Sequence, residues 1–389
     1  MADAILALNA GSSSIKFALF EVGGDGPELL SAGQVEGVGT APHFVARDAA
    51  GTVLDESWPD TADHDTLLRG MLDWADGHLG ADTLVAVGHR VVHGGREFTA
   101  PVLLTPGIVQ ALDALSPLAP LHQPHSLSPI RALAALRPGL RQVACFDTAF
   151  HHTMPAVATR FALPHKYEAE GVRRYGFHGL SYEHIARTLR DTAPDLAAGR
   201  VIVAHLGNGA SLCAMQAGRS MDTTMGFTAL DGLVMGTRCG TLDAGVVLHM
   251  LRQGLDLHEV EQVLYRQSGL LGVSGVSSDM RALLRSADPR AREAIELFVF
   301  RIARETAALA ASLGGLDGLV FTAGIGERSA DIRTLVCERL HWLGVVPDMA
   351  ANARGAGRIS AASSMVEVHV IPTDEEAMIA RHTLACIAP

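Results

Sequence analysis

Apolar residues interrupted by a polar, glycine-containing turn occur twice along the chain, about half a chain apart. Residues 5–20 read ILALNAGSSSIKFALF, and residues 201–215 read VIVAHLGNGASLCAM. Two apolar runs joined by such a turn are typical of a β-hairpin. Two hairpins of one design predict a duplicated α/β domain. The alternative is that any two hairpins look alike.

Helical and strand patterns alternate in the rest of the chain. The expected helices are residues 66–78, 106–116 and 288–313, the last with Asp288 as its N-cap and Pro289 in its first turn. The expected strands are residues 83–95 and 141–147, together with residues 318–327, which read as a buried strand, a glycine turn and a helix start. This alternation predicts mixed or parallel sheets covered on both faces by helices.

The period of two in the first hairpin separates an apolar face from a polar one. Alternate residues from 15 to 19 are apolar and are expected to face the core. The other face carries Ser12, Ser14 and Lys16, and Gly11 lets backbone N–H groups approach an anion closely. This turn is therefore either a phosphate cradle or an ordinary surface hairpin, for which scattered charges rather than a serine face would be expected.

Composition narrows the class of protein. The 389 residues predict about two domains, and 48% hydrophobic residues predict a large buried core. A net charge of −11 argues against nucleic acid or an acidic membrane surface as the main partner. The cysteines form no CxxC pair, and the N-terminus has no basic region of the kind found in signal peptides. We therefore expect a cytoplasmic protein without a membrane partner.

Lysine usage singles out the first hairpin. The chain has 31 basic residues, of which Lys16 and Lys166 are the two lysines. A compact ammonium in the opening turn suits a phosphate oxygen, and chance retention of this lysine is the alternative.

The strand around GHRVVHGG places Arg90 and Val92 on one face and His89 and His93 on the other. A guanidinium beside a small apolar group matches a short carboxylate with a small tail. The two histidines lack a third ligand nearby in sequence, so core or hydrogen-bonded histidines are favoured over zinc.

Three further polar residues lie on turns or strand ends. Asp147 ends a strand, His178 follows Phe177 between glycines, and Arg238 lies in the loop MGTRCG. Singly, each is explained as a helix cap or a solvated loop residue. Together, positive donors and a carboxylate are what a phosphoryl-transfer site requires.

The stretch TAGIGE could bring backbone N–H groups and a helix N-terminus close to a nucleotide. The sequence contains no GxxxxGK[ST] motif, so a P-loop enzyme is not indicated. GLLGVSG spaces its glycines by three, which does not match a Rossmann GxGxxG.

The order of these motifs resembles that of the acetate kinase family, also called the acetokinase family. LNAGSSSIK, GHRVVHGG, FDTAFH, YGFHG, HLGNG, DTTMGFT, MGTRCG, FTAGIGE and PTDEE occur between residues 8 and 376. The family belongs to the sugar kinase, Hsp70 and actin superfamily. The resemblance implies an α/β fold of two duplicated actin-like (ribonuclease H-like) domains with a nucleotide cleft between them, acting as a homodimer. It implies an N-terminal domain of residues 1–150 joined by a helix at about 375–389, and a nucleotide-binding and dimerisation domain of residues 151–374.

The resemblance also implies site residues. The catalytic set is Asp147, Arg90, His178, Arg238 and His122. The nucleotide set is Ser12, Ser14, Lys16, His205, Leu206, Gly207, Asn208, Gly209, Asp279, Met280, Arg281, Gly324, Ile325, Gly326, Glu327 and Arg328. The substrate set is Arg90, Val92, Leu121, Phe177 and Ala229. The metal pair is Asn9 and Glu375, for Mg²⁺ or Mn²⁺.

The implied reaction is reversible, direct in-line transfer of a phosphoryl group from ATP to acetate, giving acetyl phosphate and ADP. Acetate is already a carboxylate at neutral pH, so no general base is required to make it a nucleophile. We therefore expect Asp147 to orient magnesium or an arginine rather than to transfer a proton.

Departures from the family pattern leave alternatives open. Ala229 stands where the family usually has proline, which suggests a roomier acyl pocket and a propionate kinase as the nearest rival. Arg328 and Asp374 stand where asparagine is common, which bears on nucleotide preference and metal affinity. A nucleotide-binding protein without acyl chemistry would lack the donors named above. A sugar kinase would require a catalytic aspartate base and a polar pocket.

Overall fold

The computed structural model describes residues 2–11, 14–24, 26–38, 41–48, 50–59, 64–120, 122–355 and 357–388. The chain divides into two compact units. Unit 1 comprises residues 1–149 and 374–389, and unit 2 comprises residues 150–373.

The described part of unit 1 is built on an eight-stranded sheet with the order β5-β4-β3-β2-β1-β6-β8-β7. Strands β1, β6 and β8 are parallel neighbours, and the remaining pairs are antiparallel. The strands are β1 (Asp3–Ala10), β2 (Ser14–Gly23), β3 (Gly26–Glu36), β4 (His43–Asp48), β5 (Gly51–Ser57), β6 (Thr83–Val91), β7 (Val102–Leu103) and β8 (Arg141–Phe146).

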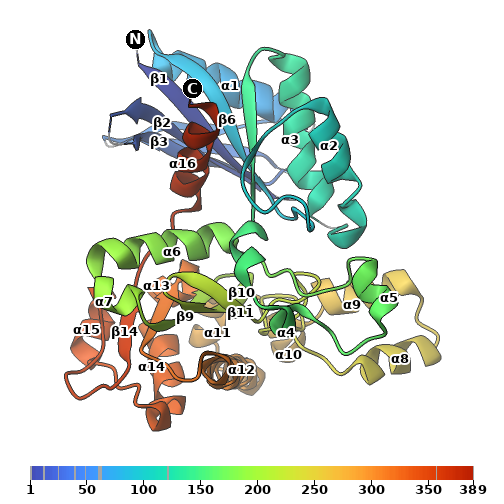
Figure 1. Cartoon of the computed structure of the whole chain (residues 1–389), viewed down its shortest axis with the longest axis vertical. Coiled ribbons are helices and arrows are strands. Elements are labelled where there is room, and N and C mark those ends of the chain that lie inside the picture. Colours follow the sequence, from blue (N-terminus) through green and yellow to red (C-terminus); the bar gives the residue numbers. More distant parts are fainter. Residues whose placement is uncertain are drawn as a thin grey trace. The chain divides into compact units, whose positions relative to one another are not determined.

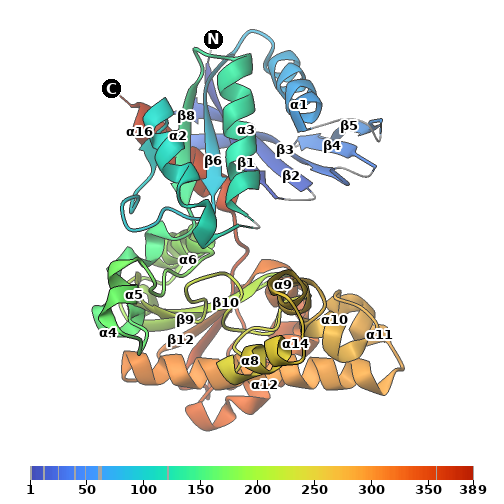
Figure 2. The same ribbon diagram turned by 90° about the vertical axis from the view of Figure 1, so that its right-hand side faces the viewer.

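Helices cover both faces of this sheet, as Figures 1 and 2 show. The helical segments are α1 (His64–Leu79), α2 (Pro106–Asp113), η1 (Ser116–Leu118), α3 (Gln123–Leu136) and α16 (Glu375–Ile387). Helices α1 and α3 pack on the face that carries Leu6, Ile15 and Phe17, whereas α16 packs on the other. The C-terminal helix thus completes the fold of the N-terminal strands.

Glycine at position 88 allows α16 to lie close to β6. A Cβ on Gly88 would lie 2.1 Å from Thr383 Oγ1 and 2.5 Å from Ile379 Cγ2. We expect Gly88→Ala to lower the free energy of unfolding by about 1–3 kcal/mol, because the packed helix must shift. Urea unfolding measures this. Gly77→Ala in α1 is the matched control, since a Cβ there meets nothing within 4 Å. Equal stability of the two variants would contradict the close packing.

Unit 2 contains, among its described residues, a six-stranded sheet with the order β11-β10-β9-β12-β14-β13. Strands β9, β12 and β14 are parallel neighbours in its centre, and antiparallel strands flank them. The strands are β9 (Arg200–Leu206), β10 (Ala210–Gln216), β11 (Arg219–Thr223), β12 (Gly318–Thr322), β13 (Gly357–Arg358) and β14 (Glu367–Val370).

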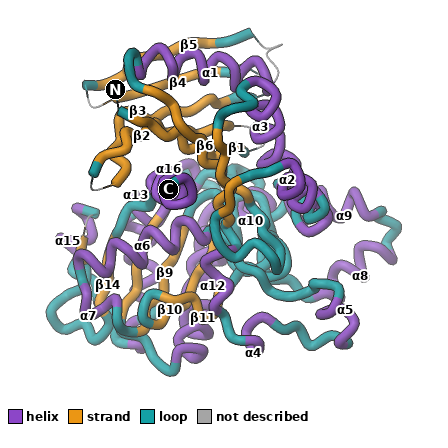
Figure 3. The backbone as a smooth tube through the Cα atoms, turned by 45° about the horizontal axis from the view of Figure 1, so that its top comes forward, coloured by secondary structure: helices purple, strands orange, loops and turns teal. Residues whose placement is uncertain are grey.

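This second sheet is also covered on both faces. Figure 3 shows α6 beside β9 and β10, and Figure 2 shows the long α12 running along the sheet. The helical segments are η2 (Ala149–Thr153), α4 (Ala156–Thr159), α5 (His165–Ala169), α6 (Gly179–Thr192), α7 (Pro194–Ala197), α8 (Ala244–Arg252), α9 (Leu257–Arg266), α10 (Gly269–Ser274), α11 (Met280–Arg285), α12 (Pro289–Leu313), α13 (Ala323–Arg328), α14 (Ala330–Arg339), η3 (His341–Leu343) and α15 (Met349–Arg354).

The predicted elements are mostly confirmed. Both hairpins form, as the antiparallel pairs β1/β2 and β9/β10. Asp288 caps α12 and accepts a hydrogen bond from the backbone N–H of Arg290. Two covered sheets confirm the mixed α/β class and fit two actin-like domains.

Three predicted segments end or turn differently in the structure. The strand expected over residues 83–95 ends at Val91, and the helix expected over residues 106–116 ends at Asp113. The glycine turn expected after residue 322 does not form: β12 passes directly into α13, and Gly324 and Gly326 lie within that helix. The change of direction falls instead on Ala323, whose φ is +64°.

Candidate active site

Four predicted residues of unit 1 meet at one edge of its sheet. Asn9 lies near the end of β1, Arg90 near the end of β6, and Asp147 directly after β8. Because these strands are parallel neighbours, their carboxyl ends lie at the same edge. Glu375 begins α16 and joins them through a hydrogen bond from Asn9 Nδ2 to Glu375 Oε2 of 3.2 Å.

Asp147 holds the Arg90 guanidinium in a two-point ion pair. Arg90 Nε lies 3.0 Å from Asp147 Oδ1, and Nη2 lies 2.5 Å from Oδ2. Arg90 Nη1 donates to Asn9 Oδ1 at 3.0 Å. The Asp147 side chain is 1% exposed, whereas that of Arg90 is 22% exposed. The carboxylate is thus buried, whereas the Arg90 side chain is partly exposed.

These contacts do not engage every N–H donor of the Arg90 guanidinium. A guanidinium has five N–H donors. Within the part of the chain that the structure describes, hydrogen bonds engage Nε and one donor on each Nη. Burial lowers the pKa of Arg90, but Asp147 and then Glu375 outweigh burial and raise it above its ordinary value. Two N–H groups of a permanently charged side chain therefore remain for an oxyanion.

Glu375 is the second carboxyl group of the cluster. Burial raises its pKa to about 7; Arg90 and Lys16 oppose this shift, whereas Asp147 and Glu376 add to it. Asp147 and the partly exposed Glu375 thus place two carboxyl groups beside one guanidinium. Asn9 offers an amide oxygen and Glu375 a carboxylate oxygen. Oxygen is the ligand type that Mg²⁺ prefers.

This set fits a magnesium ion that completes its coordination elsewhere. Among the residues that the structure describes, no three His, Cys, Asp or Glu side chains gather into a metal centre. Mg²⁺ is commonly held by one or two carboxylates together with water and substrate phosphates. Asn9 and Glu375, the predicted metal pair, fit that pattern, whereas both oxygens of Asp147 are engaged by Arg90.

The remaining predicted residues of unit 1 are more scattered. Lys16 is exposed on β2, opposite Asn9 in the strand pairing, and Ile15 and Phe17 are buried on the other face, as predicted. His122 precedes α3, and Val92 is buried just after β6. Ser14 begins β2 and is half-buried. Ser12 and Leu121 lie outside the described residues.

The two histidines of GHRVVHGG are hydrogen-bonded core residues, as predicted. His89 Nε2 lies 2.8 Å from Gln142 Oε1, and His93 Nδ1 accepts from the backbone N–H of Gly95 at 2.9 Å. Burial lowers the pKa of each to about 4, so both are neutral at physiological pH.

A second cluster forms in unit 2 around the turn of the β9/β10 hairpin. A Cβ on Gly209 would lie 2.8 Å from Arg238 Nη2 and 3.2 Å from His178 Nε2. Arg238 Nη1 donates to the carbonyl of Ala229 at 2.5 Å. The hairpin turn, the guanidinium, the imidazole and the predicted acyl-pocket residue therefore lie together.

His178 is held in an unusual conformation. It precedes α6 with φ +58°, in the left-handed region that residues other than glycine rarely adopt. Its ring stacks on that of His205 at a centroid distance of 4.1 Å. His205 Nδ1 lies 2.8 Å from Ser181 Oγ. Such local strain is typical of functional positions.

Comparison with known proteins identifies the family. The model of the acetokinase family matches residues 4–381. This chain belongs to the acetokinase family. The predicted resemblance is confirmed, and so is the prediction that the chain is a phosphotransferase.

Named relatives of this acetokinase chain cover nearly its full length. It is 57% identical to the acetate kinase of Rhodopseudomonas palustris strain TIE-1, over 98% of each chain. It is 48% identical to the acetate kinase of Rhizobium meliloti, over 99% of each. Among solved structures, a propionate kinase from Francisella tularensis has a TM-score of 0.92 at 37% identity, covering 99% of this chain and 100% of that one. Acetate kinase from Porphyromonas gingivalis has a TM-score of 0.88 at 37% identity, covering 100% of both.

The other nucleotide residues predicted from the acetokinase pattern occupy two helix starts in unit 2. Asp279 caps α11 and pairs with Arg281 at 2.6 Å, while the Met280 side chain is buried. In α13, a Cβ on Gly324 would meet nothing within 4 Å. Glu327 Oε1 accepts from the backbone N–H groups of Ala323 at 2.8 Å and Thr373 at 3.0 Å. The Glu327 carboxylate thus ties this turn to the segment before α16.

The side chains that hold the two histidines were not predicted from the sequence. Ser211 Oγ contacts both His178 Nδ1 and the Tyr182 hydroxyl, and Ser181 Oγ contacts His205 Nδ1. Tyr182 lies four residues after His178 along α6, and Ser211 pairs with His205 in the hairpin register. Pairing the two strands that flank the turn in HLGNGAS would have placed Ser211 opposite His205, and so near the predicted site.

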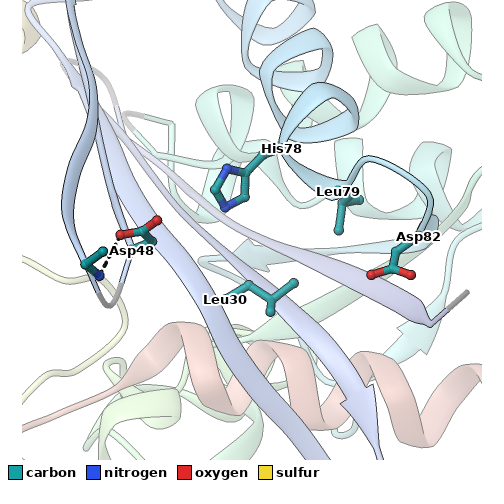
Figure 4. Close-up of a pocket in the computed structure, with 6 residues that line it drawn as sticks. Leu30, Asp48, His78, Leu79 and Asp82 are labelled. Atoms are coloured by element: carbon teal, nitrogen blue, oxygen red, sulfur yellow. Dashed lines mark hydrogen bonds between the residues drawn. The ribbon is translucent and has the colours of Figure 1, made fainter.

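A separate hollow in unit 1 contains none of the predicted acetokinase residues. Figure 4 shows this hollow of about 330 Å³, lined by Leu30, Asp48, Ala50, His78, Leu79 and Asp82. Asp48 accepts from the backbone N–H groups of Ala50 and Gly51, and Asp82 accepts from that of Ala2. Asp48 therefore serves a local turn, and Asp82 ties the start of the chain to the segment before β6.

No described helix is long and apolar enough to cross a membrane.

Proposed function

We propose that the chain catalyses phosphoryl transfer from ATP to acetate, giving acetyl phosphate and ADP. The observation that carries the proposal is the Arg90 guanidinium, fixed by a buried carboxylate while two of its N–H groups stay available. A fixed planar fork of this kind suits a small carboxylate.

The proposed reaction needs no proton transfer to begin. A carboxylate oxygen of acetate attacks the γ-phosphorus in line, and the bond to the β,γ-bridging oxygen breaks as ADP leaves. Arg90 orients the carboxylate. Arg238 and His178 donate hydrogen bonds to the phosphoryl oxygens, where negative charge is spread in the transition state.

The nucleotide and metal roles follow the acetokinase pattern. We assign ATP to Lys16 with Ser12 and Ser14, to the loop 205–209, to residues 279–281 and to residues 324–328. Mg²⁺ or Mn²⁺, when bound, neutralises phosphate charge. Asn9 and Glu375 would hold the ion, with Asp147 beside them. Asp147 serves in this proposal to keep Arg90 oriented.

A propionate kinase is the second candidate, and two observations favour it. Ala229 replaces the usual proline in the proposed pocket with Val92, Leu121 and Phe177, and the Francisella relative is a propionate kinase. One methylene changes selectivity by only about 10–200-fold in an apolar pocket.

Trapping the acyl phosphate with hydroxylamine tests both candidates. We expect ATP-dependent product with acetate, and a kcat/KM that falls from acetate to propionate to butyrate. An equal or higher value for propionate would make the chain a propionate kinase, and no product with any of the three would overturn the proposed function.

We also propose that the chain forms a homodimer through α8. Most residues of this helix are apolar, yet none of its side chains is buried. Leu248 and Leu251 are 51% and 44% exposed, and Leu257 at the start of α9 is 73% exposed. In Figure 1, α8 and α9 project from one side of unit 2. A second copy would cover this apolar patch.

Introducing charge into this face should separate the subunits. We expect the double variant Leu248→Asp, Leu251→Asp to be monomeric in sedimentation, whereas the wild type is dimeric. Met365→Asp is the control, because Met365 is 79% exposed but lies just before β14 rather than on α8. A dimeric double variant would contradict this interface.

The cysteines support a cytoplasmic location, which we propose. All five are free thiols, and Cys145, Cys213 and Cys337 are buried. Free thiols persist in reducing compartments.

A further inference from the structure

Ser211 and Tyr182 form a hydrogen-bonded chain with His178, and the proposed reaction gives them no role. His178 Nδ1 lies 2.8 Å from Ser211 Oγ, and that oxygen lies 2.5 Å from the Tyr182 hydroxyl. Tyr182 and Ser211 are fully buried. The three groups form an unbroken line from the protein interior to the imidazole.

The donor order along this line follows from the position of Tyr182. Burial raises the pKa of Tyr182 well above its usual range, so the phenol keeps its proton. Within the described residues, Ser211 is the partner of that hydroxyl. Tyr182 therefore donates to Ser211 Oγ, because its proton would otherwise be buried without an acceptor. The proton of Ser211 is then directed at His178 Nδ1.

We propose that Tyr182 and Ser211 are positioning residues that fix His178 in the tautomer with its proton on Nε2. This inference rests on the proposed function, in which His178 contacts the phosphoryl group. A neutral imidazole that accepts at Nδ1 donates at Nε2. The Nε2 atom is the one that faces the Gly209 position beside Arg238.

The opposite tautomer would work against the reaction. It would direct the lone pair of Nε2 at an anionic phosphoryl oxygen, and repulsion would replace a hydrogen bond. The ring is also kept in place by its stacking on His205, whose Nδ1 faces Ser181. Ring orientation and proton position are thus set by separate contacts.

Substitutions of Ser211 test the inference through kinetics. We expect Ser211→Ala to lower kcat about tenfold or more, with the KM for ATP and for acetate nearly unchanged. Tyr182→Phe should act in the same direction, and Ser211→Thr should restore activity because it retains the hydroxyl. Ser31→Ala is the matched control: Ser31 is a buried strand serine whose hydroxyl has no partner among the described residues. It should leave kcat unchanged.

A double-mutant cycle distinguishes positioning from a general effect on the fold. In a His178→Ala background, Ser211→Ala should cause no further loss, because its effect passes through the imidazole. An equal loss in both backgrounds, or a wild-type kcat for Ser211→Ala, would overturn the inference.

The tautomer can be measured without turnover. With ¹⁵N-labelled histidine, two-bond ¹H–¹⁵N correlations should place the His178 proton on Nε2 in the wild type, and should show a mixture of tautomers in Ser211→Ala. A proton on Nδ1 in the wild type would overturn the inference even if the enzyme is active. If no acyl phosphate forms, the proposed function fails, and this spectrum still decides the tautomer.

Discussion

Replacement of Arg90 should cause one of the two largest losses of activity. We expect Arg90→Lys to lower kcat/KM for acetate by about a hundredfold or more. Lysine keeps a positive charge beside the buried Asp147 but loses the planar fork that both engages Asp147 and leaves N–H groups for substrate. The measurement is the initial rate of trapped acyl phosphate over a range of acetate concentrations.

The chain offers a matched control for this loss. Arg200 forms an equivalent two-point pair with Asp317, with Nη2 and Oδ1 at 2.6 Å. It begins β9, six residues before the end of that strand, which is about 20 Å from the hairpin turn. Arg200→Lys should leave kcat/KM unchanged. If Arg90→Lys is no worse than Arg200→Lys, Arg90 does not bind the substrate.

Substitution of Asp147 should give the second large loss. We expect Asp147→Asn to reduce kcat/KM by about a hundredfold, because misplacing a substrate-binding group by even 1 Å can cost that much. The amide removes the charge that pairs with Arg90 and presents an NH₂ group to a guanidinium that only donates. The loss should be the same at every pH at which the protein is folded.

A pH profile separates this role from general-base catalysis. If Asp147 accepted a proton, its loss would remove a limb of the profile and high pH would restore part of the rate. Asp317→Asn is the control, as it removes the matching carboxylate of the Arg200 pair. Near-normal turnover of Asp147→Asn would contradict the orienting role.

The fold was predictable where local pattern and tertiary packing agree. Alternation along β2 correctly separated buried Ile15 and Phe17 from exposed Lys16, because one sheet face meets α1 and α3. The turn before α13 was predicted wrongly because glycine favours turns, yet tertiary structure placed the left-handed residue at Ala323. The sequence pattern alone does not show that the left-handed conformation falls on an alanine rather than on a neighbouring glycine.

The site was predictable only in part. The strand patterns gave Arg90 and Asp147, and the family resemblance gave the metal pair Asn9 and Glu375; the structure brings these residues together. The line from Tyr182 through Ser211 to His178 was missed because its contact crosses from a helix to a strand, whose packing no single segment encodes. Glu327 was assigned to nucleotide, and its hydrogen bond from the backbone N–H of Thr373, 46 residues away, depends likewise on tertiary structure.

The central claim is that a carboxylate oxygen attacks the γ-phosphorus of ATP. Reaction of ATP with ¹⁸O-labelled acetate, followed by ³¹P NMR of the acyl phosphate, tests it most directly. The account predicts one ¹⁸O atom bridging carbon and phosphorus, seen as an isotope shift of the phosphorus signal, and an ADP without label. An acyl phosphate whose phosphorus carries no ¹⁸O, or label appearing in ADP, would contradict it.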